Sequence, residues 1–485
     1  MKKKAPDGDH LRAPGPLPPP PPPPPPRGPA PPRPPRGPRP PGDPGCRHRL
    51  SRRGFLATSA TGLAGTALAA CSGAPDGAPE GGATGDPPTP ASTTAAQTTP
   101  PPTRPTAPDD AAWAHVRDHF ILEPGTAYMN NASLGMPPAS VAAAVAAGYE
   151  ALSREPIRAK HDLGDAIANR VTPRLAALLG ADPGEIVLTR NATEALHAAA
   201  IGTRLEPGDE VLITSQEHPA GRRPWEYRET RHGVRVNTVF IPSPFESEAQ
   251  VVDLVEAALT PATRALAFCH VTRGGHLYPV ARLCSLARDR GIVSHVDGAQ
   301  AVGMFPVDLH ALGCDTYSAS LHKWLLGPMG TGVYYVRAGA RERVDSAFAH
   351  DATPGAPNYG PPGTAGLPLR AGLAASLDFT DALGIGNVAA RTRHLSDLLK
   401  ERLAALPGMT PLSGPDHATS CPGSTIFELD GVDAVEAVAI LAERAKIHID
   451  EHQRDGHNAI RISTHVYNTV AEIERVVEEL DALRP

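Results

Sequence analysis

The sequence predicts an α/β protein in which a large domain, built on a mainly parallel sheet flanked by helices, precedes a smaller C-terminal α+β domain. Three observations support this fold class. From about residue 170, short apolar runs typical of buried strands alternate with segments of helical spacing. After about residue 370, two long amphipathic helices come first and short strands follow. The segment 109–485 is long enough for two such domains.

The elements of the large domain follow from local signals. The first helix ends at Gly180, and the turn Pro207-Gly208-Asp209 introduces a strand. The predicted strands are 186–188, 210–214, 234–241, 265–270, 292–296 and 314–320, and the predicted helices are 171–179, 193–201, 251–259 and 279–290. In a parallel sheet of this kind, ligands bind at the carboxyl ends of the strands.

The smaller domain is predicted over 371–485, after a large domain that covers 109–370 with its N-terminal arm. Its helices are expected at 371–384, 388–405, 432–444 and 470–483, and its strands at 424–429, 446–450 and 459–463.

The first 108 residues differ in composition from the rest of the chain. Residues 1–50 are mostly Pro, Arg and Gly, with an unbroken proline run at 18–26, so we expect them to be disordered. Residues 72–108 are rich in Gly, Pro, Thr, Ser and Ala, which is typical of a flexible linker.

Residues 51–71 have the order of an export signal. Arg52 and Arg53 precede an uncharged, moderately apolar stretch over 54–70, as in a twin-arginine signal. The sequence Leu-Ala-Ala-Cys at 68–71 then resembles a lipoprotein processing box, which predicts lipidation of Cys71. We therefore expect the twin-arginine translocation machinery as a partner, a periplasmic or cell-surface location, and membrane contact only through the signal or a lipid anchor.

Charge and cysteine usage narrow the function classes. Residues 1–53 carry 12 Lys or Arg against 3 Asp or Glu, and the whole chain has a formal net charge of −6, so the part after the signal carries −15. Such an acidic body does not favour nucleic-acid binding. The cysteines after Cys71 show no Cys-x-x-Cys pair and no metal-ligand spacing, so we expect neither a metal site nor a disulfide framework.

An acid and a lysine follow two of the predicted strands. Asp297 and Lys323 lie 26 residues apart in sequence, the lysine within a glycine-bounded polar loop. A lysine that forms a Schiff base and a carboxylate that protonates a pyridine nitrogen are what pyridoxal 5′-phosphate (PLP) requires. Gln300, three residues after the acid, is placed to reach the ring hydroxyl.

Other polar residues at strand ends complete a candidate cofactor site. The run 190–194 joins a strand to a helix, and its Thr193 hydroxyl and free N–H groups suit a phosphate. His218 follows another strand and is placed to stack on the ring. Ser320 and His322 can add hydrogen bonds to the phosphate.

Five segments, in this order, resemble the class V aminotransferases of PLP fold type I, a family that includes cysteine desulfurases, isopenicillin N epimerase-like enzymes and C–S lyases. They are TRNATEAL, SQEHPA, VDGAQAVG, SASLHKWLLGPMGTG and IRISTHVYNT. The resemblance covers roughly 125–480 and implies a homodimer with active sites at its interface. It implies Lys323 as the Schiff-base lysine, Asp297 and Gln300 on the ring, and His218 stacked on it. It also implies phosphate contacts from Ala192, Thr193, Ser320, His322 and, across the dimer, Thr364, and substrate contacts from Arg461 and Asn131.

The chain departs from the family at two positions. The stretch 452–458, where a desulfurase carries its nucleophilic cysteine, contains none, and Arg273 stands where the family often has Asn. The sequence therefore favours an exported aminotransferase-type enzyme acting on a small amino-acid or amine substrate. The alternatives are an amino-acid epimerase, a C–S lyase and, in another class, a catalytically retired tethered binding protein.

Overall fold

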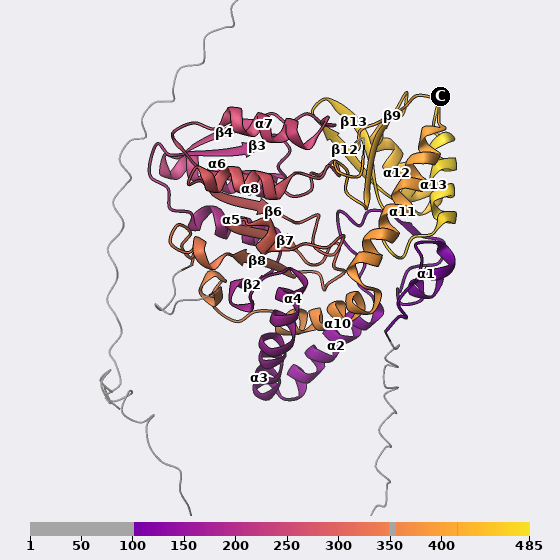
Figure 1. The fold of residues 1–485 in the computed structure, drawn as a ribbon. Coiled ribbons are helices and arrows are strands. Elements are labelled where there is room, and N and C mark those ends of the chain that lie inside the picture. The colour runs from indigo at the N-terminus through magenta and orange to yellow at the C-terminus, as the bar shows by residue number, and fades with distance from the viewer. Residues whose placement is uncertain (1–100, 349–355, 415) are drawn as a thin grey trace, which may run out of the picture. The chain divides into compact units, whose positions relative to one another are not determined.

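A seven-stranded sheet forms the centre of the large domain in the computed structural model, which describes residues 101–348, 356–414 and 416–485 (Figure 1). Its strand order is β2-β8-β7-β6-β5-β3-β4. The bounds are β2 Ile186–Thr189, β3 Glu210–Thr214, β4 Arg235–Val239, β5 Thr263–Cys269, β6 Val293–Asp297, β7 Thr316–Ser320 and β8 Gly332–Val336. Only β8 runs antiparallel to its neighbours, so the predicted mainly parallel sheet is confirmed.

Helices cover both faces of this sheet (Figure 1). They are α4 Thr172–Leu178, α5 Ala192–Gly202, α6 Pro219–His232, α7 Glu248–Ala258, α8 Val280–Asp289 and α9 Leu309–Leu312. The helices α2 Ala139–Arg154 and α3 Pro156–Ala166 pack on α10 Leu367–Leu383 instead. Successive side chains of a strand point to opposite faces. Leu266 and Phe268 of β5 therefore pack with α7 and α8, whereas Ala265 and Ala267 pack with Trp225 of α6.

Capping explains where several of these helices begin. Asn191 accepts a hydrogen bond from the backbone N–H of Glu194 at the start of α5, and Ser247 does the same for Gln250 at the start of α7. Both helices begin directly after a strand or loop that ends at the carboxyl edge of the sheet. The caps therefore also fix where the polar loops of that edge lie.

A second sheet, of order β12-β13-β10-β9, forms the smaller domain and is fully antiparallel. Its strands are β9 Met409–Pro411, β10 Ser424–Leu429, β12 Asp450–Arg454 and β13 His457–Ser463. The helices of this part are α10 Leu367–Leu383, α11 Ile385–Ala404, α12 Ala434–Ala445 and α13 Val470–Asp481. The smaller domain has its own core, in which Leu399, Phe427 and Ile460 are buried.

The N-terminal arm packs on the smaller domain rather than on the nearby helices of the large one. It contains α1 Asp110–Arg117 and β1 Ala127–Tyr128, and β1 pairs in parallel with β11 Ile447–His448. Ala127 and Met129 are buried in the core of the smaller domain. The loop after β1 is thereby carried toward the carboxyl edge of the central sheet.

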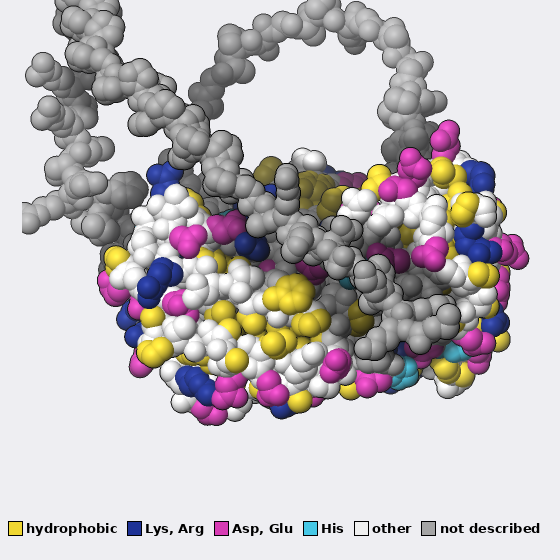
Figure 2. All heavy atoms as spheres, turned by 90° about the horizontal axis from the view of Figure 1, so that it is seen from above, with side chains coloured by type: hydrophobic (Ala, Val, Ile, Leu, Met, Phe, Trp, Pro, Cys, Tyr) yellow, Lys and Arg dark blue, Asp and Glu magenta, His cyan; other side chains and the backbone are white. Residues whose placement is uncertain are grey.

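The surface drawn in Figure 2 shows acidic and basic side chains interspersed, with a group of hydrophobic side chains between them. Among the helices that the structure describes, none has both the length and the apolar character needed to cross a membrane. The predictions for residues 1–100, among them the export signal and Cys71, lie outside the described residues. The proposed boundaries at 109 and 371 stay predictions.

Candidate active site

A cavity of about 430 Å³ lies at the carboxyl edge of the central sheet, where the loops after five of its strands meet. The walls include nine of the residues singled out in the sequence: Ala192, Thr193, His218, Asp297, Gln300, Ser320, His322, Lys323 and Arg461. Eight of them end or follow β2, β3, β6 or β7, which all end at the same edge of the central sheet, and Arg461 comes from β13 of the second sheet. The structure thus brings these residues together.

Asp297 ends β6 at the floor of the cavity and is 6% exposed. Its Oδ1 accepts a hydrogen bond from the backbone N–H of Ala299 at 2.9 Å. Burial raises the pKa of the carboxyl, and the hydrogen bond and the nearby Lys323 act against that rise. At the next residue, Gly298, there is no room for a side chain, since a Cβ there would lie 1.9 Å from the ring of Tyr317.

Lys323 lies in the loop after β7 and lines the cavity. The pKa of its amine is lowered to about 8, mainly by burial; Asp297 acts against this fall, and Arg461 and Arg273 contribute to it. A lysine with a pKa near neutral is neutral often enough to act as a nucleophile or base.

The loop after β1 packs directly against the lysine loop. Gly135 donates a backbone hydrogen bond to the carbonyl of His322 at 2.9 Å, and a Cβ at Gly135 would lie only 1.9 Å from the carbonyl oxygen of Lys323. Only glycine permits that approach. The N-terminal arm therefore holds the backbone of the lysine in place.

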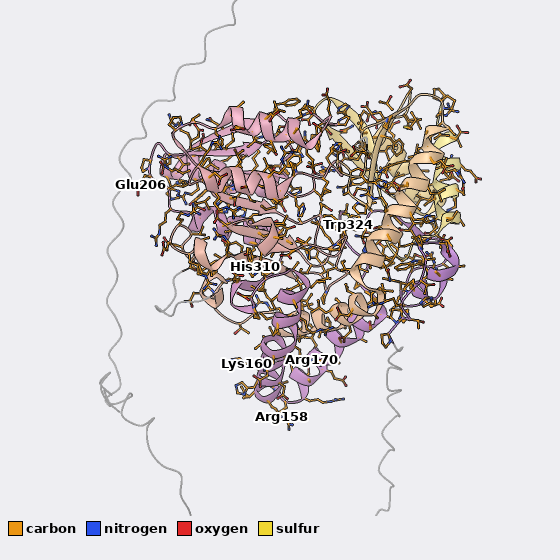
Figure 3. The ribbon with its side chains drawn as sticks, in the orientation of Figure 1. Arg158, Lys160, Arg170, Glu206, His310 and Trp324 are labelled. Carbon is orange, nitrogen blue, oxygen red and sulfur yellow. The ribbon has the colours of Figure 1, made fainter. Side chains whose placement is uncertain are left out.

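Gln300 is oriented by two hydrogen bonds. Its Oε1 accepts from Trp324 Nε1 at 2.8 Å, and its Nε2 donates to the carbonyl of Ala132 at 2.9 Å. Trp324 is fully buried in the interior (Figure 3) and packs against Gly423 of the smaller domain. Because the indole can only donate, the amide orientation of Gln300 is fixed, with one N–H left for another partner.

The start of α5 forms a cradle of donors at the side of the cavity. Ala192 N–H donates to Ser320 Oγ at 3.0 Å, and the N–H of Glu194 is used by the cap on Asn191. Thr193 is exposed toward the cavity. His322 donates from Nδ1 to the carbonyl of Thr331 at 2.9 Å, so its Nε2 can donate to an anion only when the ring is protonated. These features suit an anion at a helix N-terminus.

His218 is the N-cap of α6 and faces the cavity. Its Nδ1 accepts from the backbone N–H of Ala220 at 3.1 Å, so the proton of the neutral ring is on Nε2. Burial by the surrounding protein lowers the pKa of the imidazole to about 4, and Lys323 and the arginines of the site add to this effect. The ring is therefore neutral near pH 7 and can stack on an aromatic group.

Charged side chains of both signs meet at the end of the cavity nearest the smaller domain. Arg461 of β13 is almost fully buried, pairs with Asp450 of β12, and its pKa is lowered by burial. Arg273 donates to the Glu451 carboxylate and backbone carbonyl, both at 3.0 Å, and lies 3.7 Å from Asp450. The arginine that replaces the usual Asn of the family is thus part of an ion-pair network shared between the two domains.

The segment without a nucleophilic cysteine is an ordered hairpin. Strands β12 and β13 join through a tight turn at Asp455 and Gly456, both with positive φ. Arg454 donates to the backbone carbonyls of Gln216 and Glu217, and Gln216 Nε2 donates to the carboxylate of Asp455. The tip of the hairpin is therefore fastened to the loop that carries His218.

Two predicted site residues lie outside the cavity of this chain. Asn131 is fully buried behind its wall, where its Oδ1 accepts from the Tyr467 hydroxyl at 2.9 Å, while Ala132 and Ser133 line the cavity instead. Thr364 is exposed on the surface of its own chain. Its predicted role requires a second chain.

Two acidic residues near the cavity were not predicted from the sequence. Glu217 lies buried beneath it, accepts from Thr214 Oγ1 at 2.6 Å and from Cys269 N–H at 3.0 Å, and burial raises its pKa to about 8. Asp450 lines the cavity itself. The position of Glu217 directly before His218 could have indicated it. No local sequence pattern indicated Asp450.

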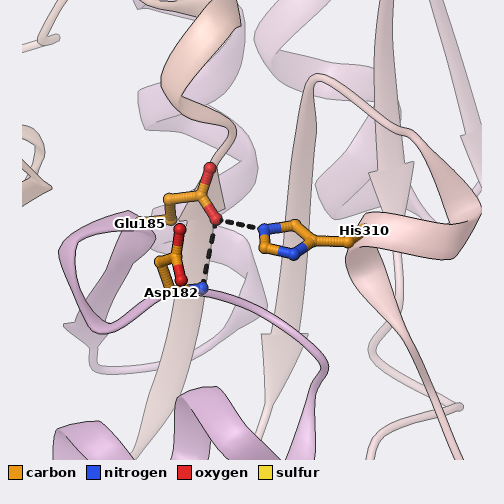
Figure 4. A group of neighbouring side chains, drawn as sticks. All are labelled: Asp182, Glu185 and His310. Atoms are coloured by element: carbon orange, nitrogen blue, oxygen red, sulfur yellow. Dashed lines mark hydrogen bonds and ion pairs between the residues drawn. The ribbon is translucent and has the colours of Figure 1, made fainter.

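Glu185, Asp182 and His310 gather elsewhere, at the start of β2 (Figure 4). Glu185 accepts from His310 at 2.7 Å, from Asp182 N–H at 3.2 Å and from Ala338 N–H at 2.7 Å. The carboxylate thus closes a capping box and joins three loops. This cluster is accounted for by its structural role.

The residues of the cavity fit PLP. They supply an amine on Lys323, a buried carboxylate on Asp297, a helix N-terminus with a serine and an imidazole beside it, and a neutral imidazole wall on His218. The donors form one cradle at the side and the carboxylate lies at the floor, as a phosphate and a pyridine nitrogen on one rigid ring require.

The chain aligns with several curated proteins over nearly the whole length of those proteins. Isopenicillin N epimerase of Streptomyces clavuligerus is 33% identical over 393 residues, 77% of this chain and 98% of that protein. The epimerase of Amycolatopsis lactamdurans is 32% identical over 403 residues, again 98% of that protein. A probable cysteine desulfurase of Xylella fastidiosa (strain 9a5c) is 30% identical over 414 residues, 78% of this chain and 97% of that protein.

Solved structures give the same fold. The cysteine desulfurase CsdA of Escherichia coli superposes with a TM-score of 0.68 at 27% identity, over 76% of this chain and 98% of that one. A C-DES mutant with glycine covalently linked to its PLP cofactor has a TM-score of 0.70 at 23% identity, over 76% and 99%. The family model for aminotransferase class V matches residues 127–476. The chain is therefore a member of the class V aminotransferase family of PLP-dependent fold type I enzymes.

Proposed function

We propose that this enzyme removes and returns the α-proton of a small amino-acid substrate, and that inversion at that carbon is its main outcome. The observation that carries this proposal is one cavity in which Lys323 faces a carboxylate floor at Asp297 and an arginine at Arg461. The first supplies a proton carrier, the second an acid for the cofactor, and the third a bidentate partner for the α-carboxylate.

PLP, when bound, withdraws electrons from the α-carbon and so acidifies its proton. The chain's own residues then decide what happens. Asp297, held by the Ala299 N–H, stays positioned to keep the pyridine nitrogen protonated. Lys323, with a pKa near 8, can take up a proton at Nζ and release it again. His218 also lines the cavity, and the proton of its neutral ring is on Nε2.

Inversion is favoured over sulfur removal and transamination by two findings. The hairpin fastened by Arg454 carries no cysteine. Cys269 does line the cavity, but it is buried and burial raises the pKa of its thiol, so it is poorly suited as a sulfur acceptor. The two epimerases match this chain at 33% and 32% identity over nearly their full length. Transamination, which the sequence motifs alone favoured, is the second candidate.

Solvent deuterium distinguishes these outcomes. PLP-loaded protein in D₂O is incubated with L- and D-amino acids, and NMR follows deuterium at the α-carbon while a chiral separation follows inversion. We expect deuterated product of both hands, and no exchange with Lys323→Ala, which should also lose the visible absorbance of the lysine-bound cofactor. A keto acid without inversion would support transamination, and an unchanged spectrum in the variant would refute the lysine assignment.

We further propose that two chains pair so that Thr364 of each reaches the cofactor site of the other. The exposed position of Thr364 is compatible with such a contact. Sedimentation of the purified protein tests the dimer, and a monomer with full activity would refute it.

Export by the twin-arginine route and a lipid anchor at Cys71 are also proposed, from the order of the sequence signals alone. This route carries folded proteins, so PLP would be bound before transport. Cell fractionation of the Arg52→Lys/Arg53→Lys double variant and of Cys71→Ala tests the two steps separately. Normal export of the first, or unchanged membrane association of the second, would refute the respective step.

A further inference from the structure

The substrate end of the cavity contains a carboxylate that belongs to the chain itself. Asp450 lines the cavity and pairs with Nη2 of Arg461. The side chain of Arg461 is 4% exposed, and a buried guanidinium is stable only with a counter-charge. Asp450 supplies that charge, and it does so at the atoms that a substrate α-carboxylate would use.

A second arginine, Arg273, lies close enough to Asp450 to replace Arg461 as its ion-pair partner. Arg273 Nη2 lies 3.7 Å from Asp450 Oδ2, also lines the cavity, and keeps a fixed position through its 3.0 Å contacts with Glu451. A small rotation of the Asp450 side chain would therefore exchange one arginine partner for the other. When a substrate carboxylate binds Arg461, both arginines and Asp450 would therefore still have a partner of opposite charge.

Two further N–H donors of Arg461, on Nε and Nη1, can bind a carboxylate during such an exchange. Its Nε is buried and has no hydrogen-bond acceptor among the residues that the structure describes, and its Nη1 makes only a long contact of 3.5 Å to the carbonyl of Arg273. An incoming carboxylate can bond to these atoms before Asp450 leaves. The buried charge is then never unpaired, which keeps the barrier to exchange low.

We propose that Asp450 is a specificity-determining residue: it competes with the substrate carboxylate for Arg461 and transfers to Arg273 when substrate binds. This inference rests on the proposed function, in which Arg461 binds the α-carboxylate. After the transfer, Asp450 still faces the cavity, where it would repel an acidic substrate side chain. The substrate class is then amino acids with uncharged or cationic side chains.

Two small carbonyl reagents isolate the carboxylate step. Aminooxyacetate and O-methylhydroxylamine both condense with the carbonyl carbon of the cofactor and release Lys323, but only the first carries a carboxylate. The loss of visible absorbance of PLP-loaded protein gives a second-order rate constant for each reagent. The ratio of the two constants, aminooxyacetate over O-methylhydroxylamine, reports carboxylate recognition and needs no knowledge of the natural substrate.

Asp450→Asn should raise this ratio about tenfold or more, because the competing charge is gone while the shape is kept. Glu428→Gln removes an acid from strand β10 of the same sheet, where it accepts from Asn458 N–H away from the cavity, and should leave the ratio unchanged. A ratio in Asp450→Asn equal to or below that of the wild type would overturn the competition.

The role of Arg273 is tested by a double-mutant cycle. Arg273→Ala should lower the ratio in the wild type, because Asp450 then has no other partner, but should hardly change it in Asp450→Asn. If Arg273→Ala lowered the ratio equally in the wild type and in Asp450→Asn, Arg273 would act only through its positive charge. That result would overturn the proposed transfer of Asp450 to Arg273.

The substrate class has its own readout. Absorbance titrations should show that the wild type binds L-glutamine more tightly than L-glutamate, with a smaller difference in Asp450→Asn. Equal affinities in the wild type would overturn this part. A protein with no visible band and no reaction with O-methylhydroxylamine would instead refute the proposed function, and the exchange with it.

Discussion

The two ends of the cavity are built in different ways. At the cofactor end, Asp297, Ser320 and Lys323 follow directly from β6 and β7, and rigid backbone contacts hold them. At the substrate end, Arg273 and Arg461 come from different domains and are held by ion pairs. The cofactor chemistry common to the family requires side chains held rigidly by the backbone. The choice of substrate, in contrast, can change when a few charged side chains change.

Asp297→Asn should have the largest effect, because it damages the rigid end. We expect turnover to fall about 100- to 1000-fold, as the cofactor loses the charge that keeps its ring protonated. Bound PLP, measured by absorbance, should remain. A variant that keeps more than half of the wild-type rate would show that the acid is dispensable.

Arg461→Lys should have a smaller effect and should leave the cofactor end untouched. A lysine cannot bond a carboxylate at two points, so kcat/KM should fall about 10- to 100-fold. The visible spectrum should match that of the wild type. If the spectrum changed as much as the rate, the two ends would not be separable.

Glu217 connects the floor of the cavity to protein stability. Its pKa is about 8 in the folded chain and near the ordinary 4.5 when unfolded, so the folded state binds more protons between these pH values. The free energy of unfolding should therefore fall as the pH rises from 5 to 8, by about 3–4 kcal/mol. Glu217→Gln should remove this decline in urea titrations at the two pH values. The same slope in the variant would assign the decline to other groups.

Arg454→Ala should have the smallest effect. It removes the hydrogen bonds from the hairpin tip to the carbonyls of Gln216 and Glu217, worth about 1 kcal/mol in stability. Limited proteolysis at the hairpin should become faster, while the absorbance of bound PLP stays as in the wild type. Unchanged proteolysis would mean that the pairing of β12 with β13 alone holds the hairpin.

The sequence allowed the cofactor end to be predicted because its signals are local. An apolar run followed by an acid, a glycine-bounded lysine and a capped helix start each mark one strand end, and the sheet brings these ends together. The six predicted strands of the large domain are present, with bounds shifted by a few residues. The resemblance to the family then fixed which polar residues mattered.

Elements whose burial depends on distant partners were missed. Strand β8 begins at Gly332 inside what reads as a loop, and only its antiparallel pairing with β2 and β7 defines it. Helix α6 contains Pro224 and has no clear apolar stripe, since Trp225 and Arg228 supply much of its buried side. A short strand expected at 446–450 is instead split between β11, which pairs with the N-terminal arm, and β12.

Asp450 shows the same limit within the site. Nothing near it in the sequence marks it as a site residue, because its importance comes from two arginines, one of them in the other domain. Glu217 likewise acquires its raised pKa only when β3, β5 and β6 enclose it. The ion pairs and the pKa of an acidic residue depend on residues that are distant in sequence, so a local sequence pattern does not reveal them.

Strand β1 joins β11 although the two are about 320 residues apart. During synthesis, the arm that presses Gly135 against Lys323 has no strand partner until β11 has left the ribosome. The wall beside the lysine is therefore completed late. A product truncated before β11 would lack the strand pairing that holds this wall.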